Sequence, residues 1–436
     1  MAEKIVLFKH LQTPDLDRLE TYRANGGYEA LRKAVTGMQP ADVTQTVKDA
    51  GLRGRGGAGF PTGLKWSFLP KDADTSYLVC NADESEPGAF KDRELMECNP
   101  HQLIEGCLIA AYAIKARHAF IYVRGEYLYI KEILDSAIAD ARAAGFVGDG
   151  IFGSSWGCEV IVYRGAGAYI CGEESAMLDS LEGYRGFPRL RPPFPAVRGL
   201  YGKPSVVNNV ETLANVPHIL ANGVDWYKAM GTEKSPGTKI CSISGPVNKP
   251  GNYELEMGTP FRYLLEQSAG GMTDGKGLKA YIPGGASAPM LPGSALDVGI
   301  DFESYPAAGS TMGSASFILF PEDSCIVFAQ LRISEFFSHE SCGKCTPCRE
   351  GTRWLRQMVE RIEEGEGREE DLPLLLDVSD NMNGKCFCAL GDFATTNIVA
   401  SIKHFRSEYE LHIREHRCPY RPGHVPERAL ATAGVA

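Results

Sequence analysis

The chain has 436 residues, of which 44% are hydrophobic and 23% are charged, and its formal net charge is −10. This length predicts roughly three domains of about 150 residues each, and the composition allows them a sizeable core. The negative charge argues against a nucleic-acid-binding protein, because nucleic-acid phosphates select basic surfaces.

The longest apolar segment is too short and too charged to span a membrane. It reads CLIAAYAIKA and contains Lys115, whereas a membrane span needs about 20 apolar residues. The first residues, MAEKIVLFKH, contain neither the apolar core of a signal peptide nor an Arg- and Ser-rich leader. We therefore expect a cytoplasmic protein that is soluble or docks peripherally.

Strand and helix signals alternate in residues 1–235, the first predicted domain. Short apolar strands are expected at residues 77–80, 119–124 and 159–163, and helices at residues 104–116 and 131–144. This alternation predicts an α/β domain with a parallel sheet covered by helices on both faces. Ligands of such sheets bind at the carboxyl ends of the strands.

Two further domains are predicted after residue 235. Residues 236–322 contain short strands, many Gly and Pro residues and one helix near residues 261–267, so we expect a small domain resembling a ubiquitin-like β-grasp. Residues 323–436 have apolar positions at helical spacing, which predicts a helical bundle, and end in a Pro-rich tail from Pro419 that we expect to be disordered.

Three of the 13 cysteines form a C-x-x-C-x-x-C motif at Cys342, Cys345 and Cys348. With a fourth, distant cysteine this is the ligand set of a [4Fe–4S] cluster, whereas a structural zinc more often takes two C-x-x-C pairs. The spacing does not decide whether the fourth ligand is Cys386 or Cys388. We expect most of the scattered remainder to be small buried hydrophobic residues: Cys80, Cys98, Cys107, Cys158, Cys171, Cys241, Cys325 and Cys418.

A glycine-rich segment, GLRGRGGAGFPTGLKW, occupies residues 51–66. Gly54, Gly56 and Gly59 satisfy G-x-G-x-x-G, but a helix pattern precedes them where a dinucleotide-binding fingerprint requires a strand. Dense glycine lets backbone N–H groups approach an anion or a flat ring, and Lys65 suits a phosphate. The alternative is a flexible surface loop.

Polar residues cluster where predicted strands end and helices begin. Carboxylates and amides at these places can bind ribose or ribityl hydroxyls or a flavin N–H. The alternatives are a solvated acidic turn and ordinary helix capping. The groups are Asn81, Asp83, Glu84 and Glu86, then Gly172, Glu173 and Glu174, and finally Asn208, Asn209 and Thr212.

Six segments, in this order, resemble the NADH-oxidising flavoprotein subunit of respiratory complex I, the NADH:quinone oxidoreductase. They are GRGGAGFPTGLKW, NADESEPGAFKDR, GAYICGEES, PPFPA, VVNNVETL and ESCGKCTPCREGT, and the resemblance extends from about Asp49 to Asp392. It implies an α/β domain that binds FMN, then a β-grasp domain, then a helical bundle with one [4Fe–4S] cluster.

The resemblance also implies roles for individual residues, with Tyr169 and Glu174 beside the reacting groups. For FMN it implies Gly54, Arg55, Gly56, Gly57, Lys65, Asn81, Asp83, Glu84, Gly172, Glu173, Asn208, Asn209 and Thr212. For NADH it implies Phe60, Phe68, Glu86, Glu174, Arg191 and Phe194, and for the cluster Cys342, Cys345, Cys348 and Cys388. The chain departs from the family in having Arg191 where Lys is common and in having Cys386 as an extra thiol.

The implied activity is hydride transfer from NADH to FMN, followed by single-electron transfer to the cluster and on toward quinone. The implied partners are a thioredoxin-like [2Fe–2S] subunit and a large iron–sulfur subunit, which would hold the chain at the cytoplasmic face of a bacterial inner membrane. Alternatives are the flavoprotein subunit of a soluble NAD-linked hydrogenase or formate dehydrogenase, and a cluster-containing relay without flavin.

Overall fold

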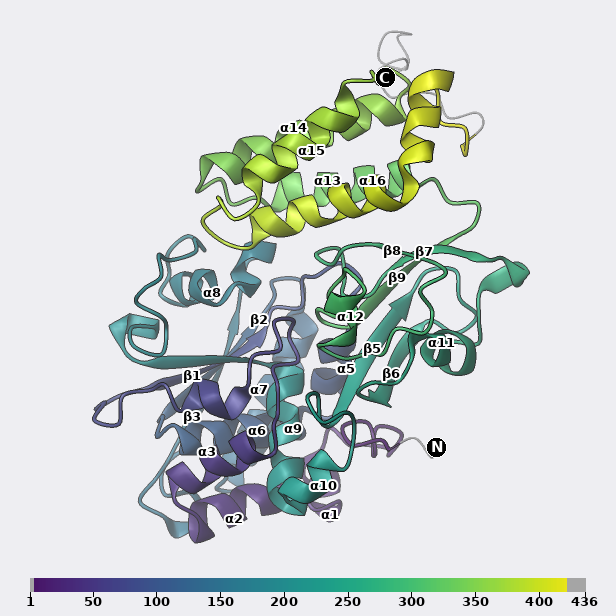
Figure 1. The fold of residues 1–436 in the computed structure, drawn as a ribbon. Helices are drawn as coiled ribbons and strands as arrows, with labels where there is room; N and C mark the ends of the chain where they lie inside the picture. Colours follow the sequence, from purple (N-terminus) through teal and green to yellow (C-terminus); the bar gives the residue numbers. More distant parts are fainter. Residues whose placement is uncertain (1–3, 422–436) are drawn as a thin grey trace.

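The computed structural model describes residues 4–421 and has the three predicted architectures in the predicted order (Figure 1). The predicted Pro-rich tail lies, from residue 422 on, outside the described residues. Within residues 4–421, no helix is both long and apolar enough to cross a bilayer.

The α/β domain is built on a four-stranded parallel sheet in the order β3-β2-β1-β4. The three strands that the sequence predicts are confirmed, and the sequence analysis missed the fourth. Their bounds are β1 Tyr77–Ala82, β2 His118–Val123, β3 Glu159–Arg164 and β4 Ser205–Asn209.

Helices cover both faces of this sheet, as predicted. Alternate residues of β1 face opposite sides, so Leu78 and Cys80 pack in one core while Val79 packs in another. The first core includes α6 Pro100–Ala113, which is buried along its whole length, with α7 Leu128–Ala143 and α9 Val210–Asn222. The second includes α8 Glu174–Leu181 and extends into the other two domains.

Short helices complete the α/β domain and place the glycine-rich segment. They are α1 Leu19–Ala24, α2 Glu29–Gly37, α3 Pro40–Asp49, α4 Thr62–Trp66, α5 Lys91–Cys98 and α10 Val224–Lys228. The glycine-rich segment follows α3 and ends with α4, so a helix precedes it, as the sequence indicates. It is therefore not the strand–loop–helix unit of a dinucleotide-binding fingerprint.

The second domain has a mixed five-stranded sheet in the order β6-β5-β9-β7-β8. Its strands are β5 Thr238–Ser244, β6 Gly251–Glu256, β7 Leu278–Ile282, β8 Leu291–Pro292 and β9 Ser316–Pro321. The parallel pairing of β5 with β9, flanked by antiparallel strands, matches the expected β-grasp architecture. The expected helix is α11 Phe261–Tyr263, continued by a π-helical turn, and α12 spans Ser304–Ala307.

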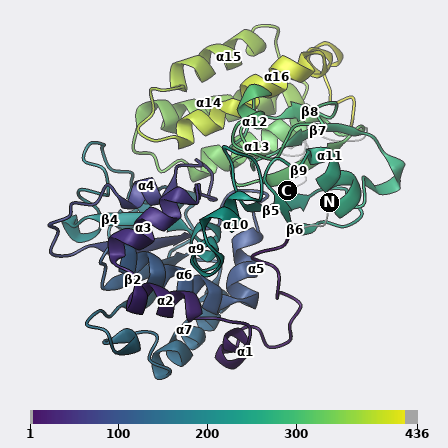
Figure 2. The same ribbon diagram turned by 60° about the horizontal axis from the view of Figure 1, so that its bottom comes forward.

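The C-terminal part is a bundle of four helices: α13 Ile326–Glu340, α14 Thr346–Glu363, α15 Asp371–Met382 and α16 Leu390–Glu415. α16 bends at Phe405, whose backbone is not helical. The bundle and the β-grasp sheet lie side by side against the α/β domain (Figure 2). All three domains therefore meet near the carboxyl ends of the parallel strands.

Candidate functional site

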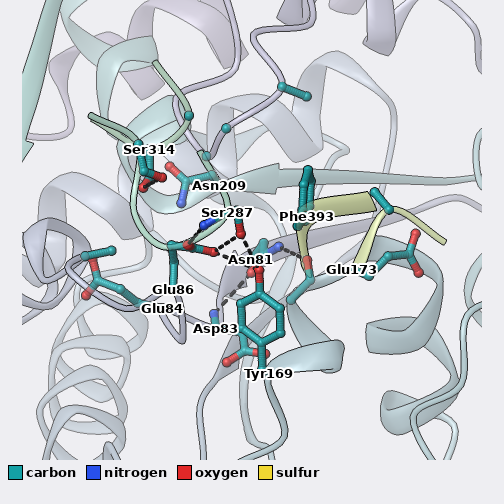
Figure 3. Close-up of a pocket in the computed structure, with 18 of the residues that line it drawn as sticks. Asn81, Asp83, Glu84, Glu86, Tyr169, Glu173, Asn209, Ser287, Ser314 and Phe393 are labelled. Carbon is teal, nitrogen blue, oxygen red and sulfur yellow. Dashed lines mark hydrogen bonds between the residues drawn. The ribbon is translucent and has the colours of Figure 1, made fainter. Parts of the chain in front are cut away.

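A cavity of about 460 Å³ lies where the three domains meet (Figure 3). This volume is within the range of about 300–1,000 Å³ that is usual for small-molecule sites. The α/β domain contributes predicted site residues: Gly56, Gly57, Asn81, Asp83, Glu84, Glu86, Tyr169, Gly172, Glu173 and Asn209. The other domains contribute lining residues that are not among the predicted site residues, including Ser287, Thr311, Ser314, Leu390 and Phe393.

The glycine-rich segment forms one wall of the cavity. A Cβ atom at Gly56 would lie 2.9 Å from the Cβ of Asn209, so this close approach requires glycine. A Cβ at Gly57 would meet no heavy atom of the described residues within 4 Å, which leaves space for a ligand. The segment is held in place because the Arg55 N–H donates to Thr212 Oγ1 at 2.8 Å.

Arg55 anchors this wall from behind and does not itself line the cavity. Its buried guanidinium donates to the hydroxyl of Tyr227 at 3.0 Å and to the carbonyl of Pro236 at 2.8 Å. Gly54 and Thr212 likewise lie outside the cavity lining, and the Gly54 N–H donates to the Phe60 carbonyl at 2.9 Å. These three predicted FMN residues thus shape the loop, whereas Gly56 and Gly57 face the cavity.

Asp83 lines the cavity, and one oxygen of its carboxylate is buried without a hydrogen-bond partner within residues 4–421. Its Oδ1 accepts from the Ser85 hydroxyl, but the buried Oδ2 has no hydrogen-bond partner among the described residues. Burial raises the pKa of Asp83 to about 7. A buried polar atom normally has a partner, so the unpaired Oδ2 marks Asp83 as an unsatisfied position in the cavity wall.

Asn81 and Glu84 are already engaged within the protein. Asn81 donates through Nδ2 to the Gly172 carbonyl at 2.8 Å. Glu84 accepts from the N–H groups of Asp92 at 2.7 Å and Arg93 at 2.9 Å, so it caps the start of α5. Burial raises its pKa to about 7. Both side chains rigidify the strand end from which Asp83 reaches the cavity.

Glu86, Tyr169 and Ser287 form a hydrogen-bonded group between the α/β and β-grasp domains (Figure 3). The Glu86 carboxylate accepts from the Ser287 N–H at 2.8 Å, the Ser287 hydroxyl at 2.7 Å and the Tyr169 hydroxyl at 2.7 Å. Burial raises the pKa of Glu86. The loop with Ser287 can come this close because Gly285 has a φ of +83° and a Cβ there would lie 2.5 Å from Glu86.

Ion pairs extend from the cavity wall at Glu173. This residue caps α8, and its other oxygen pairs with Arg191. Arg191 is also 3.4 Å from Glu174, which in turn pairs with Lys65 at 2.7 Å. Lys65, Glu174 and Arg191 do not line the cavity, and the two cations together balance the charges of Glu173 and Glu174.

The aromatic residues predicted to contact NADH are exposed and lie outside the cavity lining. Phe60 and Phe68 are 45% and 51% exposed, and their ring centroids are 6.0 Å apart. Phe194 is 56% exposed. Asn208, in contrast, is buried and accepts from Trp66 Nε1 at 2.7 Å, so it faces away from the cavity.

A second, small cavity is lined by Cys342, Cys345, Cys348 and Cys388. Cys386 does not line it, and its thiol lies 3.4 Å from the Met382 carbonyl. Burial raises the pKa of Cys348 to about 11 and that of Cys388 to about 12. Thiols in such surroundings become thiolates when a metal supplies positive charge, so this donor set fits an iron–sulfur cluster.

The two cavities share part of their walls. Cys388, Ile170 and Leu390 line both of them, so one cysteine of the small cavity also borders the larger cavity. A Cβ at Gly391 would lie 2.2 Å from the Cys386 thiol, which shows how tightly this turn packs. The fold therefore places a small-molecule site and a four-cysteine site next to each other.

Comparisons with known proteins agree with this arrangement of two sites. Three protein-family models match: the Nuo51 FMN-binding domain over residues 47–218, the SLBB domain over residues 240–290, and the NADH-ubiquinone oxidoreductase-F iron-sulfur binding region over residues 329–412. The first covers the α/β part of the large cavity, and the last includes all four cysteines of the small one.

Relatives that match along nearly their whole length bear similar names. The chain is 54% identical to the second F-subunit of NADH-quinone oxidoreductase from Rhizobium meliloti (strain 1021), over 95% of this chain and 99% of the relative. It is 49% identical to the NADH-quinone oxidoreductase F-subunit of Escherichia coli (strain K12), over 91% of this chain and 90% of the relative.

A solved structure of an NAD+-reducing [NiFe]-hydrogenase in the air-oxidised state is also similar, with a TM-score of 0.82 and 35% identity. The match covers 99% of this chain but 70% of the hydrogenase chain, so the two oxidoreductase relatives agree better in both identity and length. This chain belongs to the family of NADH-quinone oxidoreductase F-subunits.

Proposed function

We propose that this chain oxidises NADH at an FMN bound in the large cavity and passes the electrons to a [4Fe–4S] cluster bound by the four cysteines. The observation that carries this proposal is that Cys388 lines both cavities. When bound, FMN supplies hydride chemistry with NADH and single-electron chemistry with the cluster. The protein then has to orient the two groups and exclude water.

The cavity walls suit this task. The backbone at Gly56 and Gly57 offers a surface that a flat ring can approach, and Asp83 lines the same cavity. The group formed by Glu86, Tyr169 and Ser287 ties the β-grasp domain to the α/β domain across the cavity. We assign direct FMN contacts to the cavity-lining residues and supporting roles to Arg55, Asn208 and Thr212.

We assign NADH to the side where the aromatic residues are exposed. The rings of Phe60, Phe68 and Phe194 are available to stack on an adenine. Glu174 would repel the negatively charged nucleotide and assist its release only if its pairs with Lys65 and Arg191 open, since these now balance its charge. Lys65 could then reach a phosphate.

The family assigns the chain to an NADH-quinone oxidoreductase complex. We propose that its neighbours there are a thioredoxin-like [2Fe–2S] subunit and a large iron–sulfur subunit. These would dock it at the cytoplasmic face of a bacterial inner membrane, so that it contacts the membrane only indirectly. We propose no contact with nucleic acid, in keeping with the net charge of −10.

A matched pair of cysteine variants tests the proposed function and the ligand set together. We expect Cys388→Ser to lose most cluster iron, and with it the paramagnetic signal of the reduced cluster, while NADH still bleaches the flavin absorbance. Cys386→Ser should keep both iron and signal, because its thiol lies outside the cysteine-lined cavity. Iron analysis, visible absorption and electron paramagnetic resonance of the anaerobic chain give the three readouts.

Two results would count against the proposal. Loss of iron in Cys386→Ser but not in Cys388→Ser would show that the fourth ligand is misassigned. Flavin that is bound but not bleached by NADH in the unsubstituted chain would contradict the proposed function itself.

A further inference from the structure

A second group of metal-ligating side chains lies at the other end of the helical bundle. Cys325, Glu363, His412 and Cys418 are all buried, and their ligand atoms all lie within 4.8 Å of one another. From the sequence, Cys325 and Cys418 are expected to be small buried hydrophobic residues; both are buried, but they lie next to each other and to Glu363 and His412. Nothing in the NADH-oxidising site uses this group.

The four residues come from four places that only the folded bundle brings together. Cys325 is the N-cap of α13, Glu363 is the last residue of α14, His412 is near the end of α16, and Cys418 follows α16. The bend of α16 at Phe405 carries its last turns across the bundle end (Figure 1). Cys348 and Glu363 lie in the same helix, about 22 Å apart at 1.5 Å per residue. The group is therefore separate from the cluster.

Four of the six distances between these atoms are those of a tetrahedral shell, and the other two are within 4.8 Å. Cys325 Sγ lies 3.6 Å from Cys418 Sγ, 3.3 Å from His412 Nε2 and 3.5 Å from Glu363 Oε2. Glu363 Oε2 lies 3.2 Å from His412 Nε2. Tetrahedral zinc with Zn–S bonds of about 2.3 Å and Zn–N or Zn–O bonds of about 2.0–2.1 Å separates its ligand atoms by about 3.2–3.8 Å.

Neighbouring groups orient the ligands toward one point. His412 Nδ1 lies 2.7 Å from the Glu408 carbonyl, which can only accept, so a neutral ring presents the lone pair of Nε2 to the group. Arg421 holds the other oxygen of Glu363 at 3.2 Å. The Phe328 N–H faces the Cys325 sulfur at 3.3 Å. Such outer contacts fix the orientation and basicity of metal ligands.

Charge and donor type also favour a metal. Hydrogen bonds and an ion pair join these side chains in the absence of a metal, and a tetrahedral ion would replace them with four metal–ligand bonds. Two thiolates and one carboxylate carry three negative charges, which a divalent ion and Arg421 together neutralise. Sulfur, imidazole and carboxylate donors in a closed set of four are typical of structural zinc.

We propose that Cys325, Glu363, His412 and Cys418 bind a structural zinc ion that fastens the far end of the helical bundle. With four protein ligands the ion has no open position for a substrate. Its role is to tie α13, α14 and α16 to the segment that follows them, at a distance from the redox groups.

The test measures zinc on the full chain purified with its iron–sulfur cluster. We expect about one zinc per chain by elemental analysis, and zinc-edge X-ray absorption with two sulfur scatterers near 2.3 Å and two nitrogen or oxygen scatterers near 2.0–2.1 Å. Cys418→Ser should lower the affinity for added Zn²⁺ at least about tenfold. Cys418→His, which restores a ligand atom, should recover part of it.

Cys98→Ser is the matched control, since Cys98 is a half-buried thiol at the end of α5 and outside the group. It should retain zinc, and all variants should retain iron. Absence of zinc from a chain supplied with it, four sulfur scatterers around zinc, or a Cys325–Cys418 disulfide in unreduced protein would each overturn the proposal. If Cys418→Ser does not fold, the absorption spectrum of the unsubstituted chain still decides the question.

Discussion

Asp83 is the cavity-lining residue with a buried side-chain oxygen that has no hydrogen-bond partner in residues 4–421. Its Oδ2 is buried without a hydrogen-bond partner among the described residues, and burial raises its pKa to about 7. Between about pH 4 and pH 7 the folded chain therefore keeps Asp83 mostly protonated, whereas the unfolded chain ionises it.

This difference in protonation predicts a pH-dependent effect of Asp83→Asn in the flavin-free chain. Since the folded-state pKa is raised, the native Asp83 contributes less stability as pH rises from about 4 to 7. The variant has no such loss, so its free energy of unfolding relative to the unsubstituted chain should increase over that window by up to about 4 kcal/mol and stay constant above it.

Unfolding in urea at several pH values measures this difference. Asp149→Asn is the control, because Asp149 is exposed on a loop and does not line the cavity, and we expect it to leave the pH profile unchanged. A difference for Asp83→Asn that is the same at pH 4 and pH 7 would show that the native carboxyl is not held in an unfavourable ionisation state.

At the scale of elements, the crossing of α6 and α9 positions Asn209 at the cavity. Gly106 in α6 lies against the backbone of α9, and a Cβ there would be 2.2 Å from the Leu213 carbonyl oxygen. Asn209 is the N-cap of α9 and also donates to Asp92 at 2.7 Å. Separating the two helices should therefore destabilise the α/β domain and displace Asn209 from the cavity wall.

Gly106→Ala should destabilise the α/β domain by about 1–3 kcal/mol, since overpacking at a helix crossing forces the backbone apart. Gly37→Ala is the matched control at the end of α2, where a Cβ would meet no described heavy atom within 4 Å. We expect it to change stability by less than about 0.5 kcal/mol. Thermal unfolding and FMN titration compare the two variants. Equal stability of the two variants would contradict the claim that close packing of α6 against α9 stabilises the domain.

Local sequence patterns predict the elements well and the direction of individual side chains less well. The strand at residues 77–80 and the glycine-rich loop after a helix are confirmed. Asn208 and Asn209 look equivalent in the sequence, but neighbouring residues of a strand point to opposite faces. Asn208 therefore reaches Trp66 while Asn209 faces the cavity. The strand β4, which would have revealed this, is the one that the sequence analysis missed.

At the scale of the whole molecule, the site exists only because three domains meet. Ser287, Ser314 and Phe393 close the cavity from the β-grasp domain and the bundle, and no local pattern predicts how separate domains dock. The glycine pair shortly before Ser287, Gly284 and Gly285, is a weak sequence signal for a cavity wall, because it resembles the pair at Gly56 and Gly57. The choice between Cys386 and Cys388 also needs the docked bundle, because they are close neighbours in the chain but only Cys388 lines the cavities.

The proposed function requires that electrons from NADH reach the cluster through FMN. The most direct measurement adds NADH anaerobically to two samples of the chain, one loaded with FMN and one freed of it, and records the paramagnetic signal of the reduced cluster. We predict the signal within seconds in the FMN-loaded chain and its absence from the flavin-free chain, although dithionite reduces the cluster in both. Equal reduction by NADH in both samples, or none in the loaded chain, would contradict the account.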